Sequence, residues 1–163
     1  MIEVAAATGV IKLVSSSVGL IDKVYDSWTK YVGNNKIEQS RVSEYSEKIE
    51  AKNQNKELVY SIKGQPAQTL SYEELRINLS PQDFDTIDAL STRMTINVRT
   101  WQTIVRDIEL ETNLATKAKY EIQLDNLKKK IGDDLNAIIG FVEFLGFRLG
   151  DHYMSARAIA RGL

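Results

Sequence analysis

Few side chains in this sequence could do acid–base or metal chemistry. There is a single histidine, His152, and there is no cysteine among the 163 residues. A zinc site needs three or four nitrogen, sulfur or oxygen ligands, so we expect no metal site. His152 could exchange protons with Asp151 or Asp107, but a lone histidine without a partner at a fixed spacing is more typical of a surface position or a helix end.

Two short stretches are rich in carboxylates: Asp83, Asp85 and Asp88 in "DFDTID", and Asp107, Glu109 and Glu111 in "DIELE". Acidic residues are favoured at the positive end of a helix, so a solvated acidic face is a simpler interpretation than an acid–base or metal site. The sequence contains no glycine-rich phosphate loop and no G-x-S-x-G nucleophile motif. We therefore expect no catalytic residue, no cofactor and no enzyme activity.

Lysines gather in residues 114–130, namely Lys117, Lys119, Lys128, Lys129 and Lys130. The net charge of the whole chain is −1, so the total charge favours no nucleic-acid partner. These lysines form an exposed helix face, or they contact anionic lipid, to which each lysine near the surface would contribute about 1 kcal/mol.

The elements that must position these side chains are mainly helices. The composition, 43% hydrophobic and 26% charged, is typical of a soluble globular protein, and the length favours one domain spanning 1–163. Only two prolines and nine glycines interrupt the chain, which favours long helices. We predict a mainly α fold: a four- to five-helix bundle with a short β-hairpin between the second and third helices.

The pattern of apolar residues predicts the first half of this fold. Within 1–32, apolar residues recur at helical spacings, and "GNN" at 33–35 provides a stop. A thin apolar stripe in 36–56 predicts an amphipathic helix with a wide polar face. Alternating residues within 58–72, on either side of "KGQPAQ", predict the hairpin.

Long helices are predicted from 80 to 160. In "LSPQDF", Ser80 suits the N-cap and Pro81 the first helical position, which predicts a helix over 80–111. A basic helix over 114–130 should then end at "KKKIGDD". There Gly132 allows a stop, and one of the two following aspartates, Asp133 or Asp134, would cap the last helix.

The apolar stretch Ile2–Ile21 is long enough to cross a bilayer, which takes about 20 residues. No Lys or Arg precedes it and no small-residue cleavage site follows, so we expect no secretory signal peptide. Lys12 at mid-bilayer would cost roughly 2.5–3.5 kcal/mol, which disfavours a permanent span. A helix buried in a soluble bundle fits the pattern. So does a helix that is buried in one state and inserts as an oligomer in another, with Lys12, Ser15 and Ser16 facing a wet lumen.

The stretch "IEVAAATGVIKLVSSSVGLIDKVYDSW", at the head of a small helical bundle, resembles the HeLo and HeLo-like domains of fungal cell-death proteins and the bacterial Bell domains. For residues 1–32 the resemblance lies in the pattern of apolar residues, and for the rest of the chain it lies in the number and length of the helices. It implies a non-enzymatic, pore-forming domain that damages membranes once it is oligomerised. The positions that it implies for membrane insertion are Val4, Gly9, Val10, Ile11, Lys12, Leu13, Val14, Val18, Gly19, Leu20 and Ile21.

We therefore expect a membrane-targeting cell-death or defence effector domain that is cytoplasmic and translocates to the inner face of the membrane. Its expected partners are anionic membrane lipid, further copies of the chain, and a regulatory protein or fused sensor domain. The alternative is a soluble protein–protein interaction or adaptor domain with no membrane role, in which the N-terminal helix is simply the core.

Overall fold

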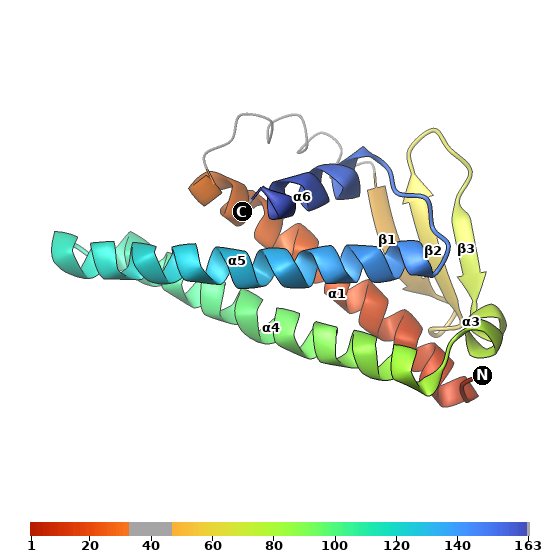
Figure 1. Ribbon diagram of the computed structural model, residues 1–163. Helices are drawn as coiled ribbons and strands as arrows, with labels where there is room; N and C mark the ends of the chain where they lie inside the picture. Colours follow the sequence, from red (N-terminus) through yellow and green to blue (C-terminus); the bar gives the residue numbers. More distant parts are fainter. Residues whose placement is uncertain (33–46, 163) are drawn as a thin grey trace.

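The computed structural model describes residues 1–32 and 47–162, and the structural statements below concern these residues. They form five helices and a three-stranded antiparallel sheet (Figure 1). In chain order the elements are α1 (Val4–Val32), β1 (Glu47–Lys52), β2 (Glu57–Ile62), β3 (Gln68–Ser71), α3 (Tyr72–Asn78), α4 (Pro81–Leu110), α5 (Leu114–Phe144) and α6 (Asp151–Arg161). The predicted mainly α class is confirmed.

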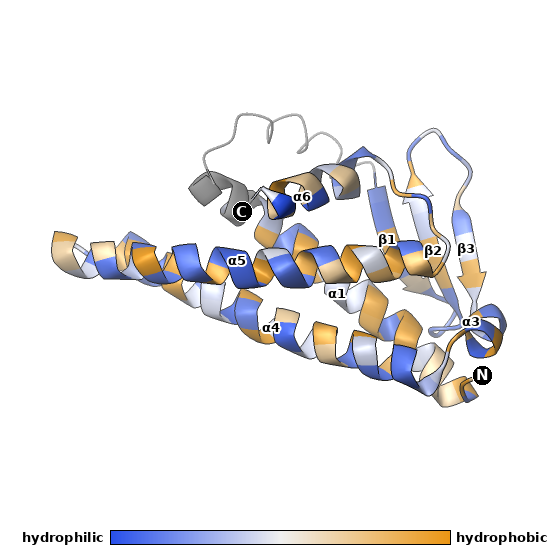
Figure 2. Cartoon of the chain, in the orientation of Figure 1, coloured by the Kyte–Doolittle hydropathy of each residue, from blue (hydrophilic) through white to orange (hydrophobic). Residues whose placement is uncertain are grey.

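The longest helices, α4 and α5, lie side by side and extend beyond the other described elements (Figure 1). The predicted start of α4 is confirmed: the Ser80 hydroxyl accepts the Asp83 N–H at 3.2 Å, and the Asp83 carboxylate accepts the Ser80 N–H at 2.8 Å. After a short connection, Asn113 caps α5 by accepting the N–H groups of Ala115 and Thr116. Hydrophobic and hydrophilic segments alternate along both helices, as amphipathic helices require (Figure 2).

Helix α1 supplies the centre of the hydrophobic core. It packs chiefly against α4, and also against α3, β1 and α5. Its buried apolar side chains are Ala7, Val10, Ile11, Val14, Val18, Ile21, Val24 and Tyr25. These side chains form one continuous cluster with the inner faces of α4 and α5. Since a fully buried aliphatic side chain contributes about 1.5–3 kcal/mol, α1 is a major source of the stability of the bundle.

The sheet departs from the predicted hairpin because it has an additional strand. Strands β2 and β3 pair as expected, but β1 pairs with β2 on its other side, with Ile49 opposite Tyr60. The predicted helix over 36–56 is therefore wrong for Glu47–Lys52, and its first part, 36–46, lies outside the described residues. The Glu, Lys and Ala residues of β1 favour a helix locally, but pairing with β2 and burial of Ile49 outweigh that preference.

The predicted helix break at "KKKIGDD" is also wrong, because α5 continues through it to Phe144. Gly132 and Asp134 are buried inside the helix, and Asp133 is exposed on its surface. An interior glycine costs about 1 kcal/mol, which is less than the burial of neighbouring apolar residues such as Ile131 supplies. The chain turns instead at Gly146, whose φ of +106° suits glycine, before α6 begins.

Candidate functional site

One described helix is long and apolar enough to cross a membrane by length and composition, over the 22 residues Val4–Tyr25 of α1. The core helix of a soluble protein and a signal sequence pass the same test. Of the residues predicted to insert, five are buried: Val10, Ile11, Val14, Val18 and Ile21. Gly9, Leu13, Gly19 and Leu20 are half-buried, and Val4 and Lys12 are exposed.

The exposed face of α1 is narrow, and it carries cations and small side chains. Lys12, Ser16 and Lys23 are exposed, and their spacings of four and seven residues place them on one side of the helix. Gly19 lies on the same side, and a Cβ added there would meet no other group within 4 Å. Helix α1 therefore combines a wide apolar arc in the core with a narrow polar stripe, Lys12–Ser16–Lys23, in solvent.

The serines predicted to line a lumen with Lys12 do not all lie beside it. Ser16 shares its exposed face, whereas the Ser15 hydroxyl accepts the backbone N–H of Ala51 in β1 at 3.3 Å. Ser17 is buried, and its hydroxyl donates to the Leu13 carbonyl at 2.7 Å. In this structure Ser15 thus anchors the middle of α1 to the sheet.

An apolar hollow of about 620 Å³ lies where α1 and α4 begin. Its lining includes Met1, Glu3 and Ala5 from one side and Phe84 and Asp85 from the other. Gly9 lies beside it, and a Cβ there would stand 3.1 Å from the Phe84 ring, so the two helices approach closely at this point.

A buried polar cluster joins α1 to the sheet and to α6. The Nε2 atom of His152, which is fully buried, lies 2.8 Å from Oδ1 of Asp22. The Glu47 carboxylate, 3% exposed, accepts the backbone N–H of His152 at 3.0 Å and the hydroxyl of Tyr60 at 2.7 Å. The Tyr60 oxygen in turn accepts the N–H of Gly150 at 2.7 Å. We call these five residues the Glu47 cluster.

Within the Glu47 cluster, the carboxylate of Glu47 caps α6 in place of a side chain from the helix itself. Gly150 at the N-cap has no side chain to offer, and a Cβ there would collide with the carboxylate. Burial raises the pKa of Tyr60, so its phenol stays protonated and donates to Glu47. Among the described residues, Nδ1 of His152 has no hydrogen-bond partner, and the rings of Tyr25 and Tyr153 lie against the imidazole.

Sequence reasoning missed the Glu47 cluster and placed His152 wrongly. His152 lies at a helix end as expected, but it is buried rather than on the surface, and its partner is Asp22 instead of Asp151 or Asp107. No spacing could have shown this contact, because 130 residues separate the pair. Within residues 1–32 and 47–162, no group of three or more His, Asp or Glu side chains could hold a metal ion.

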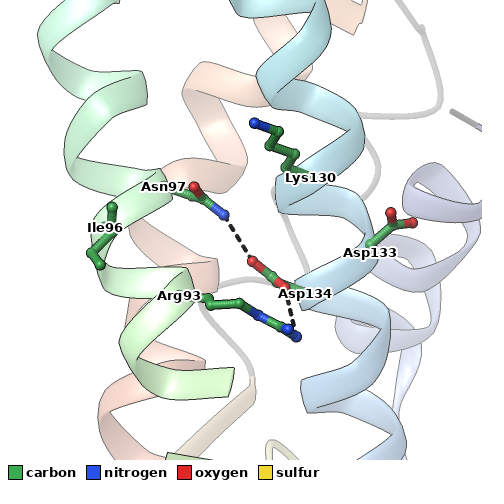
Figure 3. A pocket seen from close by; sticks show the side chains of 6 residues that line it. All are labelled: Arg93, Ile96, Asn97, Lys130, Asp133 and Asp134. Atoms are coloured by element: carbon green, nitrogen blue, oxygen red, sulfur yellow. Dashed lines mark hydrogen bonds and ion pairs between the residues drawn. The ribbon is translucent and has the colours of Figure 1, made fainter. Parts of the chain in front are cut away.

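A second polar group lies between α4 and α5. The Asn97 amide donates to Oδ2 of buried Asp134 at 2.9 Å, and the Arg93 guanidinium lies 3.2 Å from Oδ1 (Figure 3). With Ile96, Lys130 and Asp133, these side chains line a surface hollow of about 390 Å³. Desolvation raises the pKa of Asp134, against the opposing effects of Asn97 and Arg93. This aspartate therefore ties the two long helices together, and the predicted role of a helix cap is wrong.

The five lysines predicted to contact lipid do not share one face of α5. Lys117 and Lys128 fall on one line of the helix, and Lys119 and Lys130 fall on the opposite line. Lys129 lies between these two lines. Lys128 is half-buried, and its ammonium lies 3.2 Å from Asp125. The lysines thus surround α5 rather than forming a single flat cationic surface.

Comparison of the chain with protein-family models, with curated proteins and with solved structures finds no match. The geometry of α1 and of the groups that hold it is therefore the basis for a candidate function.

Proposed function

We propose that this chain is a membrane-acting effector domain whose helix α1 is held in the bundle at rest and inserts, as part of an oligomer, on activation. The observation that supports the proposal is the cross-section of α1. Its 22-residue apolar span carries one narrow stripe, Lys12–Ser16–Lys23. In an oligomer, the wide apolar arc would face lipid and the stripe would face water or a neighbouring copy.

Because α1 is packed in the core, its release from the bundle needs a second environment that buries its apolar side chains again. The helix would expose eight buried apolar side chains, which costs on the order of 10–20 kcal/mol by burial alone. A monomer in solution keeps its helix, because nothing offsets that cost. A bilayer and adjacent copies of α1 together would bury the same surface again. Activation by oligomerisation is also what the resemblance to HeLo-like and Bell domains implies.

Vesicle permeabilisation tests the proposal. Dye-loaded vesicles containing phosphatidylglycerol are mixed with the full chain, and separately with the full chain fused to a trimeric coiled coil. We expect dye release by the fused form and little release by the monomer. The proposal fails if the fused form also leaves the dye trapped.

A matched pair of variants assigns the release to α1. Gly19→Glu replaces a small residue on the stripe side of α1, where a neighbouring copy would pack closely in the oligomer, at a position where the folded bundle leaves open space. Gly140→Glu makes the same change in α5, at an exposed glycine that also has open space around it. We expect Gly19→Glu to abolish dye release by the fused form and Gly140→Glu to retain it, with circular dichroism showing both variants folded. Equal release by the two variants would contradict a role for α1.

A second candidate function is that of an interaction or adaptor domain, and the observation that favours it is the projecting tip of the α4–α5 hairpin. Leu110 and Leu114, at 75% and 82% exposed, flank the connection between these helices. Under this alternative, Leu110→Ser with Leu114→Ser would abolish the association of the chain with its partner protein, and Gly19→Glu would not. Under the membrane proposal, the tip variants would leave dye release unchanged.

A further inference from the structure

The outward face of α4 carries an ordered set of charges. Eight residues at spacings of three or four form one stripe, and all are exposed: Asp85, Asp88, Thr92, Ile96, Arg99, Thr103, Arg106 and Leu110. We call this set the α4 stripe. Its N-terminal half is acidic and its C-terminal half is basic, with Ile96, 57% exposed, near the middle. In the described part of the chain, the four charged side chains of the stripe, Asp85, Asp88, Arg99 and Arg106, have no hydrogen-bond or ion-pair partner.

We propose that the α4 stripe is the contact surface for a second copy of this chain, with the two α4 helices antiparallel about a two-fold axis near Ile96. In this arrangement Arg106, ten residues after Ile96, lies opposite the acidic half of the second copy, where Asp85 and Asp88 lie eleven and eight residues before it. Arg99 lies opposite Thr92 of the second copy, one helical turn from Asp88.

The order of charges along the α4 stripe favours a second copy of the chain as the partner and an antiparallel arrangement of the two helices. A two-fold contact brings the same surface of each copy together, so the surface must be complementary to itself when it is reversed. The α4 stripe meets that condition because its acidic and basic halves exchange places about Ile96. A parallel arrangement would instead oppose like charges along the whole helix. Asp107, half-buried beside the basic half, reduces its positive charge but does not cancel it.

The size of the surface predicts a weak, salt-sensitive dimer. From Asp85 to Leu110 the stripe is about 38 Å long at about 1.5 Å per residue, and a helix is roughly 10 Å wide. The contact would bury about 800 Å² over both copies, at the low end for transient complexes. Charge pairs in such contacts are screened by salt. This inference rests on the α4 stripe alone and does not depend on the proposed membrane activity.

Two charge-reversal variants, measured by analytical ultracentrifugation, test whether this dimer forms. One variant carries Asp85→Arg with Asp88→Arg, and the other carries Arg99→Asp with Arg106→Asp. We expect the wild type to dimerise at low salt and to dissociate as salt is raised, and each variant alone to show a dissociation constant at least about tenfold higher. An equimolar mixture of the two variants should form a heterodimer, because one stripe is then wholly basic and the other wholly acidic.

A control pair and a cross-link complete the test. Lys63→Asp with Lys129→Asp reverses the same number of positive charges at exposed positions outside the α4 stripe, and it should leave the dimer intact. The chain has no cysteine, so Ile96→Cys should give a disulfide-linked dimer under mild oxidation, whereas Lys63→Cys should not. The proposal is overturned if the wild type remains monomeric at low salt, or if the charge variants dimerise separately as well as the wild type does. Circular dichroism checks that each variant is folded.

Discussion

At the scale of single residues, the carboxylate of Glu47 does the most to join separate parts of the chain. It accepts hydrogen bonds from Tyr60 of β2 and from the first turn of α6, while the side chain of His152 contacts Asp22 of α1. A buried carboxylate is costly unless donors surround it, and here both of its oxygens are engaged. The Glu47 cluster therefore fixes the position of α6 against the sheet and α1.

Removal of this carboxylate should be strongly destabilising. Glu47→Ala leaves the Tyr60 hydroxyl and the His152 N–H without their acceptor, so we expect the free energy of unfolding to fall by about 2–4 kcal/mol. Denaturant unfolding followed by circular dichroism measures the change. Glu50→Ala on the same strand, where the side chain makes no hydrogen bond to any other described residue, should change it by less than about 0.5 kcal/mol. Similar losses in both variants would contradict the role assigned to Glu47.

Asp134 should give the stability a distinct pH dependence. Desolvation raises its pKa above the ordinary value of 3.8, so the native state holds the proton more tightly than the unfolded state does. Its contribution to stability is therefore present at low pH and is lost as the pH rises through the native pKa. The unfolding free energy of the wild type minus that of Asp134→Asn should decrease as the pH rises above about 4, by about 1.4 kcal/mol for every tenfold difference in proton affinity between the native and unfolded states. A difference independent of pH would contradict this assignment.

Some residues of these sites could be predicted from short-range sequence patterns, but their long-range contacts could not. Ser80 and Asp83 were predictable because a helix N-terminus needs acceptors at fixed spacings, and the structure shows both hydrogen bonds. Glu47 and His152 are 105 residues apart, and their contact depends on how the sheet packs against α6. A buried acid–histidine cluster of this kind has no signature in the spacing of its residues.

At the scale of elements, the helices were predictable where their ends are coded locally. The capping box at Ser80 and the cap at Asn113 mark α4 and the start of α5. Strand β1 was not predictable, because its residues favour a helix and its pairing with β2 depends on the tertiary structure. The continuity of α5 was not predictable either, because packing against α4 outweighs the small cost of Gly132.

Two glycines should respond in opposite directions to the same substitution. Gly140→Ala places a methyl group in open space on α5 and removes flexibility from the unfolded chain, so we expect a gain of about 0.5–1 kcal/mol. Gly150→Ala drives a methyl group into the Glu47 carboxylate, so we expect a loss of about 1–3 kcal/mol. Thermal unfolding of both variants measures the changes. A loss for Gly140→Ala, or no change for Gly150→Ala, would contradict the packing described here.

At the scale of the whole molecule, α1 cannot be separated from the fold. It lies against α3, α4, α5 and β1, and its side chains belong to the single core cluster. A role in membranes and a role as the core of an interaction domain both require this helix at rest. They differ only in whether oligomerisation ever draws it out of the bundle.

Deletion of the first helix should therefore unfold the remainder. Without residues 2–25, the inner faces of α4 and α5 lose the side chains that cover them, and this loss is at least as large as the roughly 5–15 kcal/mol that stabilises most domains. We expect aggregation or loss of a cooperative thermal transition, measured by calorimetry. Point variants such as Gly19→Glu, which leave the bundle intact, are for this reason the sharper probes of membrane activity. A truncated chain that unfolds cooperatively would show that α1 is dispensable.

The position of Trp101 gives the protein an internal optical reporter. Its indole is fully buried in the contact between α4 and α1, and its N–H donates to the Ser27 hydroxyl at 2.8 Å. If α1 left the bundle, the indole would lose that hydrogen bond and meet solvent or lipid. The chain has two tryptophans, so Trp28→Phe would leave Trp101 as the sole emitter. The wavelength of its fluorescence would then report, in real time and without a label, whether the first helix has moved.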